Sequence, residues 1–157
     1  MREIKFRGKA LEDGYDFNID DFVYGYLVCD EDGETFIVGP VLESNAELIA
    51  PEWWVPVDRA TVGQYTGLRD KNGVEIYEDD KFQYHKHKGY ILPDFTGEIL
   101  FRDGCFGYVA TSENMGEAFH SFSEFDELQA YFLDHIEIIG NIHDKYKQKQ
   151  ALIDTMR

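Results

Sequence analysis

The chain has 157 residues, of which 15 are basic and 31 acidic, giving a formal net charge of −16. A chain of this length suits one domain, or one domain with a small annex, and buries enough surface to fold without a disulfide or a metal. The content of hydrophobic (43%) and aromatic (15%) residues excludes collagen-like, coiled-coil and wholly disordered chains, and the acidic excess argues against a protein that binds the phosphate backbone of nucleic acids.

The charge is unevenly distributed along the chain. The net charge is −9 over residues 1–60, −2 over 61–110 and −5 over 111–157. No linker rich in Pro, Gly or Ser separates these regions, so we expect one domain over 1–157. We also consider a subdivision of it into an acidic β subdomain (1–60), a β-barrel (61–143) and a helical tail (144–157).

Tight turns that join antiparallel strands are the dominant local signal. Residues 30–33 (Asp-Glu-Asp-Gly) and 70–73 (Asp-Lys-Asn-Gly) place Asp first and Gly fourth, as a type I turn favours. The Asp carboxylate bonds the turn amides, and Gly accepts the positive φ that follows. Because strand-forming residues flank the first turn over 22–28 and 35–38, we predict a hairpin there.

A third hairpin is predicted at Asp103 and Gly104. These two residues separate the apolar runs 97–101 and 105–109, and Asp-Gly between apolar runs is among the strongest short-range hairpin signals. Further upstream, two prolines bound residues 51–56, which we expect to be extended.

Helix is the minority signal. Residues 121–124 form a Ser-x-x-Glu capping box, and Phe125, Leu128 and Phe132 follow at helical spacing, which predicts a helix over about 123–134. Residues 135–142 have the pattern of a strand. The chain is therefore predicted to be mainly β, with antiparallel hairpins forming a small SH3-like barrel or coiled sheets and one or two short helices; an α+β fold is the alternative.

Motifs of common catalytic sites are absent from the sequence. There is no Walker-type phosphate loop, Gly-x-Gly-x-x-Gly, Gly-x-Ser-x-Gly or His-Glu-x-x-His, so we expect neither an enzyme nor a bound cofactor or metal. Cys29 and Cys105 lack zinc-type spacing and are expected to be reduced thiols. The first residues lack the apolar run of a signal peptide, and no apolar stretch approaches the ~20 residues that span a bilayer, so a cytoplasmic location is predicted.

Two groups of side chains have the chemistry of a metal site. His85 and His87 alternate and would share one face of a strand, but Lys86 and Lys88 would repel a cation. The adjacent carboxylates of residues 78–80 (Glu78, Asp79 and Asp80) could hold magnesium or act as an acid/base pair. For the histidines we therefore favour a solvated basic strand end. For the carboxylates, strand neighbours point to opposite faces, so at most two of the three converge and the rest are solvated.

The remaining candidate residues have structural interpretations. His120, His135 and His143 are isolated and are interpreted as hydrogen-bonded structural residues. Trp53 and Trp54 could form an aromatic binding surface, but core packing or a partly covered patch is favoured.

Residues 62–82 carry a specific pattern, Val-Gly-Gln-Tyr-Thr-Gly-Leu-Arg-Asp-Lys-Asn-Gly-Val-Glu-Ile-Tyr-Glu-Asp-Asp-Lys-Phe. This segment resembles the signature of the YopX-like family of bacteriophage and prophage proteins. Residues 2–7, 97–106 and 136–143 resemble the family's start, second hairpin and closing strand. One departure is Asp79, where family members usually have Gly. The resemblance implies a largely β fold, a phage or prophage gene and the host cytoplasm, and carries no established activity.

Four functions are compatible with these observations. The leading hypothesis is an acidic phage accessory protein that acts by binding a protein partner, because the charge favours basic surfaces. The alternatives are a DNA-mimic inhibitor of a host DNA-binding protein, a metal-assisted hydrolase using Glu78, Asp80 and either His85 or His87, and a structural or assembly protein that forms homo-oligomers. Neither direct nucleic-acid binding nor membrane association is expected.

Overall fold

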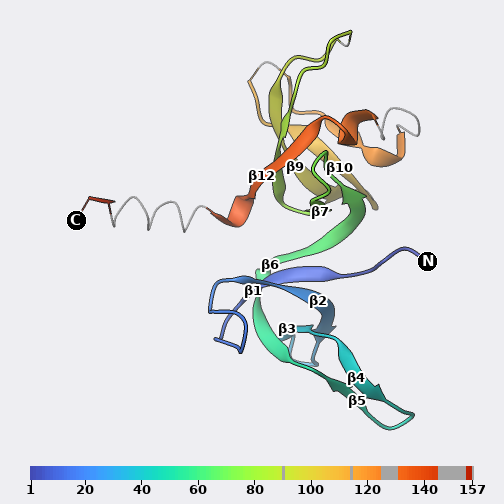
Figure 1. The fold of residues 1–157 in the computed structure, drawn as a ribbon, viewed down its shortest axis with the longest axis vertical. Coiled ribbons are helices and arrows are strands. Elements are labelled where there is room, and N and C mark those ends of the chain that lie inside the picture. The colour runs from blue at the N-terminus through green and yellow to red at the C-terminus, as the bar shows by residue number, and fades with distance from the viewer. Residues whose placement is uncertain (90, 114, 125–130, 145–154, 157) are drawn as a thin grey trace. The chain divides into compact units, whose positions relative to one another are not determined.

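The structure is a computed structural model that describes residues 1–89, 91–113, 115–124, 131–144 and 155–156 (Figure 1). Every strand pair whose register is defined is antiparallel, and strands dominate the described residues, which confirms the predicted mainly β fold. The elements are β1 (Phe6–Ala10), β2 (Phe22–Cys29), β3 (Thr35–Val38), β4 (Val41–Ser44), β5 (Ile49–Pro51), β6 (Trp54–Arg69), β7 (Glu75–Tyr77), β8 (Asp80–Tyr84), β9 (Phe95–Arg102), β10 (Cys105–Ala110), β11 (Phe119–Ser121), β12 (Ile136–Asn141) and the 3-10 helices Phe122–Glu124 and Ile142–Asp144.

The chain divides into two compact units, Met1–Tyr65 and Thr66–Arg157. The long strand β6 contributes residues to both. No helix within the described parts of the chain has the length and apolar character needed to cross a bilayer.

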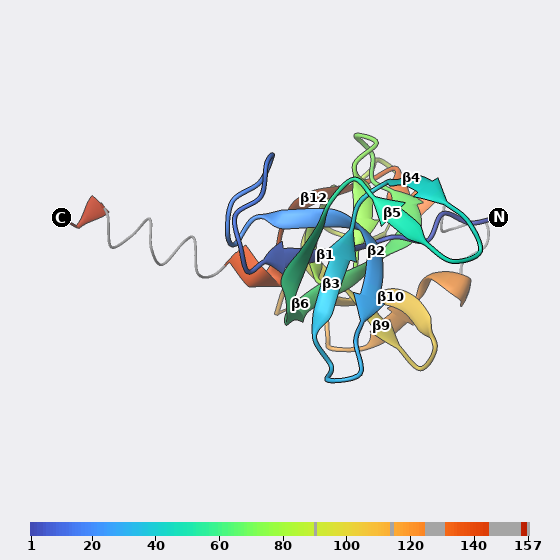
Figure 2. The same ribbon diagram turned by 90° about the horizontal axis from the view of Figure 1, so that it is seen from below.

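The first unit is built on the sheet β1-β2-β3-β6, in which β1 also pairs with β6 (Figure 2). Residues 22–25 of β2 pair with β1, whereas residues 26–29 pair with β3, so β2 changes partner midway. Alternate residues of these strands point inward, because one face of a sheet must bury its apolar side chains. The core contains Ala10, Val23, Ile37, Val55 and Val57.

The second unit contains the sheet β11-β10-β9-β8-β12, and β7 pairs with the end of β6. In the described chain β11 and β12 lie at opposite ends of this order and do not pair, so this sheet is open. Of the two arrangements predicted, an SH3-like barrel or coiled sheets, a clean barrel is therefore not found in this unit. The hairpin signals predict which strands are neighbours. They do not predict whether a sheet closes into a barrel.

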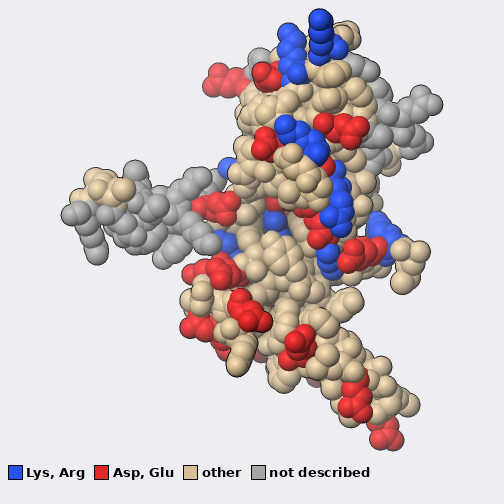
Figure 3. All heavy atoms as spheres, viewed as in Figure 1, with Lys and Arg blue, Asp and Glu red and all other residues tan. Residues whose placement is uncertain are grey.

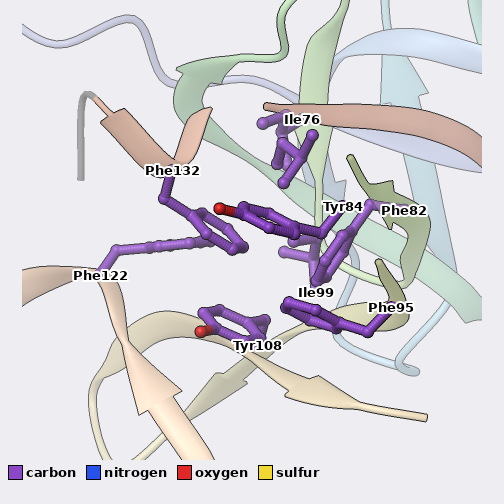
Figure 4. Close-up of a cluster of buried hydrophobic side chains, with 9 residues drawn as sticks. Ile76, Phe82, Tyr84, Phe95, Ile99, Tyr108, Phe122 and Phe132 are labelled. Atoms are coloured by element: carbon purple, nitrogen blue, oxygen red, sulfur yellow. The ribbon is translucent and has the colours of Figure 1, made fainter. Parts of the chain in front are cut away.

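Aromatic rings fill the core of the second unit (Figure 4). The fully buried ring of Phe82 makes edge-to-face contacts with Phe95, Tyr108 and Phe132 at centroid distances of 5.9, 5.6 and 5.7 Å. Such edge-to-face pairs are a favoured geometry for aromatic side chains. The aliphatic side chains packed among these rings are Ile76, Ile99 and Ile136.

The two Asp-first turns form as predicted. Gly33 and Gly73 have φ values of +84° and +79°. In each turn Oδ1 of the first residue, Asp30 or Asp70, accepts the amides two and four residues further on, at 2.8–2.9 Å. The hairpin at Asp103 and Gly104 is also confirmed: both residues have positive φ, as a two-residue type I′ turn requires, and they join β9 to β10.

The predicted helices fall in the C-terminal third of the chain, and the structure describes only part of them. Ser121 Oγ accepts the amide of Ser123 at 3.1 Å, as an N-cap does, but the turn that follows is a 3-10 helix. Residues 131–133 are helical, and 125–130 lie outside the described residues. The predicted strand over 135–142 is confirmed as β12, whereas most of the predicted helical tail lies outside the described residues.

Candidate functional site

The adjacent carboxylates at the start of β8 do not converge on one point. Asp80 is 2% exposed, and its Oδ2 accepts the amide of Tyr77 at 2.8 Å, which fixes the turn between β7 and β8. Asp79 has a φ of 71° and places Oδ2 3.0 Å from Nε2 of His143. This left-handed backbone explains why Gly is usual at position 79, and the contact with His143 gives the Asp a structural role.

The histidines after β8 contact different partners. β8 ends at Tyr84, so His85 and His87 both follow the strand. His85 Nε2 lies 2.9 Å from Glu137 Oε2, whereas the ring of His87 stacks on His135 at a centroid distance of 4.5 Å. Among the described residues, no group of three or more His, Cys, Asp or Glu side chains is placed to hold a metal ion.

His135 is partly buried beside other titratable groups. Burial, the neighbouring His87 and the ammonium of Lys71 lower the pKa of its imidazole, and the Asp134 carboxylate only partly opposes them. His120 stacks on the ring of Tyr108 at 5.0 Å. The thiols of Cys29 and Cys105 are both free and lie in different units.

The outward face of the first sheet is apolar and accessible. Tyr26, Val38 and Trp54 lie opposite one another on three neighbouring strands, and the two aromatic side chains are 55% and 64% exposed. Trp53, by contrast, packs on the inner side, edge-on to Phe17 at 5.5 Å. Hence the tryptophan pair divides between core and surface. We call the following side chains the outer sheet face: Tyr24, Tyr26, Val28, Phe36, Val38 and Trp54.

A hollow of about 260 Å³ adjoins the outer sheet face. A Cβ at Gly25 would lie 2.2 Å from the carbonyl oxygen of Val38, so only glycine permits the approach of β2 to β3 at this point. We call this feature the tyrosine hollow; it is lined by Glu3, Ile4, Lys5, Tyr24, Gly25, Tyr26, Gly39 and Pro40.

The surface of the first unit is more acidic than its composition indicates. Thirteen of its fourteen acidic residues are exposed. Of its five basic residues, Arg7 and Lys9 are buried with their charged groups over the ring of Phe22. Lys5 Nζ lies 3.3 Å from Glu3 Oε1 and 5.0 Å from the ring centroid of Tyr65. On the face seen in Figure 3, acidic side chains are separated by other residues and do not join into one stripe.

Acidic residues border the outer sheet face. The turn between β2 and β3, at one end of the face, contains three exposed carboxylate side chains, Asp30, Glu31 and Asp32, and Glu34 follows immediately. The guanidinium of Arg59 approaches the same turn near Gly33. This border contains four acidic groups and one cation, so its net charge is negative.

Comparison with known proteins agrees with the resemblance seen in the sequence. The sequence model of the YopX protein family matches residues 27–147. The chain belongs to the YopX family. The matched range includes the signature at 62–82, the hairpin at Asp103 and Gly104, and β12. No curated protein matches this YopX chain significantly in sequence.

A solved structure has the same fold as this YopX protein. The crystal structure of protein EF1440 from Enterococcus faecalis is similar with a TM-score of 0.55 and 23% sequence identity, over 94% of this chain and 99% of that chain. At this identity the likeness establishes the fold alone.

The outer sheet face was missed by sequence reasoning. Residues 22–28 were correctly predicted to form a strand, but apolar side chains occupy both alternating sets, Val23 and Leu27 as well as Tyr24 and Tyr26. Alternation therefore gave no indication of which set faces the core.

Proposed function

We propose that this YopX protein is a non-enzymatic accessory protein of a phage or prophage, which acts in the bacterial host cytoplasm by binding a protein partner. The observation that carries the proposal is the outer sheet face, with Tyr26 and Trp54 more than half exposed. Exposed apolar surface of this kind marks interaction sites, and Tyr and Trp supply much of the binding energy at interfaces.

The charge around the outer sheet face supports a basic protein as the partner. An apolar centre with a charged border is the usual anatomy of a protein–protein interface. The first unit has a net charge of −9, and this charge would attract Lys and Arg side chains and steer their approach. The same charge repels a second copy of this chain and the phosphates of nucleic acids.

Affinity capture from lysate of a host carrying the phage tests the proposal. The wild-type protein should retain a partner identified by mass spectrometry, and retention should fall as salt is raised. Trp54→Ser removes an exposed anchor and should abolish retention. Ile139→Ser, at a 55% exposed position of β12, is the matched control and should retain the partner.

Two results would contradict the proposed function. One is the absence of any salt-sensitive partner at low salt. The other is equal retention of the partner by wild type and Trp54→Ser, which would place binding elsewhere on the chain. Circular dichroism of both variants checks that they fold as the wild type does.

A further inference from the structure

We propose that the tyrosine hollow binds a proline-rich, extended segment of the partner that carries Arg or Lys beside its prolines. The inference rests on the proposed function and names the chemistry of the segment bound. Tyr24 and Tyr26 are 50% and 55% exposed and occupy alternate positions of β2 on one face, with Pro40 and Ile4 also lining the hollow.

The spacing of the two tyrosines fits a polyproline II helix. Alternate residues of a strand are about 6.7 Å apart. A polyproline II segment rises about 3.1 Å per residue with three residues per turn, so residues on one face recur about every 9.3 Å, whereas one Xaa-Pro pair is about 6.2 Å long. A single Xaa-Pro pair can therefore lie across the two rings.

Proline-rich segments also match the chemistry of the lining. Aromatic-lined grooves recognise such segments because the extended helix is formed before binding and loses little entropy. Its carbonyl groups make no internal hydrogen bonds, so they can accept bonds from tyrosine hydroxyls. The hollow, at about 260 Å³, has room for a few pyrrolidine rings and is smaller than the usual drug-sized pocket of about 300–1,000 Å³.

Charge decides between a peptide and a nucleic acid as the occupant. Two exposed tyrosines can also stack on the bases of single-stranded nucleic acid. Sites of that kind, however, bind the phosphates in a positively charged groove. Here the basic side chain that lines the hollow, Lys5, is paired with Glu3, and the unit carries a net charge of −9. Arg or Lys side chains flanking the prolines would be attracted to the same surface.

Fluorescence anisotropy with labelled decapeptides tests the inference. The panel has proline at alternate positions and one arginine moved along the sequence, and a matched panel has every proline replaced by alanine. At least one proline peptide should bind the wild-type protein about tenfold or more tightly than its alanine counterpart. Tyr26→Ala should weaken that binding about tenfold or more, and Tyr26→Phe less, because the ring remains. Ile139→Ser should bind as the wild type does.

Three results would overturn the inference: no proline peptide binds below 1 mM, the alanine panel or a labelled single-stranded oligonucleotide binds as tightly, or Tyr26→Ala leaves peptide binding unchanged. The capture experiment separates this failure from failure of the proposed function. If Tyr26→Ala still retains the partner that Trp54→Ser loses, the chain binds a protein through the outer sheet face and the tyrosine hollow is not the site.

Discussion

Asp70 links a turn to a strand far along the chain. Its Oδ1 accepts two amides of its own turn, and its Oδ2 accepts the amide of Ile138 in β12 at 2.9 Å, in a position only 7% exposed. Asp30 makes the same two turn bonds and is exposed. Thus the two residues differ mainly in burial and in the third bond.

Substitution of these aspartates measures the value of that link. Asp70→Ala leaves a partly buried amide of β12 without its acceptor and removes two bonds of the turn, so we expect the free energy of unfolding to fall by about 2–3 kcal/mol. Asp30→Ala, the matched control, should cost less than about 1 kcal/mol because water replaces the carboxylate. Urea denaturation measures both, and equal losses would contradict this role of Asp70.

His135 makes stability depend on pH. Because the folded protein lowers the pKa of this imidazole below its ordinary value of 6.5, the unfolded chain binds the proton more tightly. Its contribution to stability is therefore complete above pH 6.5 and is lost as the pH falls through the lowered pKa. We expect the melting temperature to fall less between pH 7.5 and 5.5 in His135→Gln than in the wild type. An identical fall in both proteins would show that this group does not contribute.

At the scale of elements, β2 depends on the glycine at which it changes partner. The side chain added by Gly25→Ala would meet the carbonyl oxygen of Val38 at 2.2 Å, so the strands must separate, at a cost of about 1–3 kcal/mol. Gly104→Ala is the control, since its φ of +82° strains alanine but no atom lies within 4 Å of the added carbon; it should cost about 1 kcal/mol.

Chemical denaturation measures both losses of stability, and peptide binding should reveal a second difference between these glycine variants. Gly25→Ala should also disturb the tyrosine hollow, because Gly25 lies between Tyr24 and Tyr26, and should weaken binding of the proline peptides. Gly104→Ala should leave peptide binding unchanged. If Gly25→Ala is as stable as the wild type, the close approach of β2 to β3 is not required.

Elements specified by adjacent residues were predictable from the sequence. The turns at Gly33, Gly73 and Gly104 were found because the Asp carboxylate and the positive φ of Gly are local requirements. The open sheet of the second unit was not predictable from the sequence, because strand order depends on contacts between residues that are distant in the chain. The same limit applies to His87 and His135, whose stacked rings are 48 positions apart in the chain.

At the scale of the whole molecule, composition predicted an acidic protein but not the distribution of its charge. Burial of Arg7 and Lys9 in the first unit removes positive charge from its surface. No pattern in the sequence predicts which basic residues will be buried. The structure and its likeness to protein EF1440 establish the fold, and membership of the YopX family leaves the partner open. The outer sheet face depends on strand pairing, so it emerged only from the structure.

Amide hydrogen exchange on the complex with the captured partner tests the central claim most directly. Binding through the outer sheet face predicts slower exchange in residues 24–28, 36–38 and 54–56 when the partner is present, with β9 and β10 unchanged. Slower exchange confined to residues 66–157, with the first unit unaffected, would contradict the account.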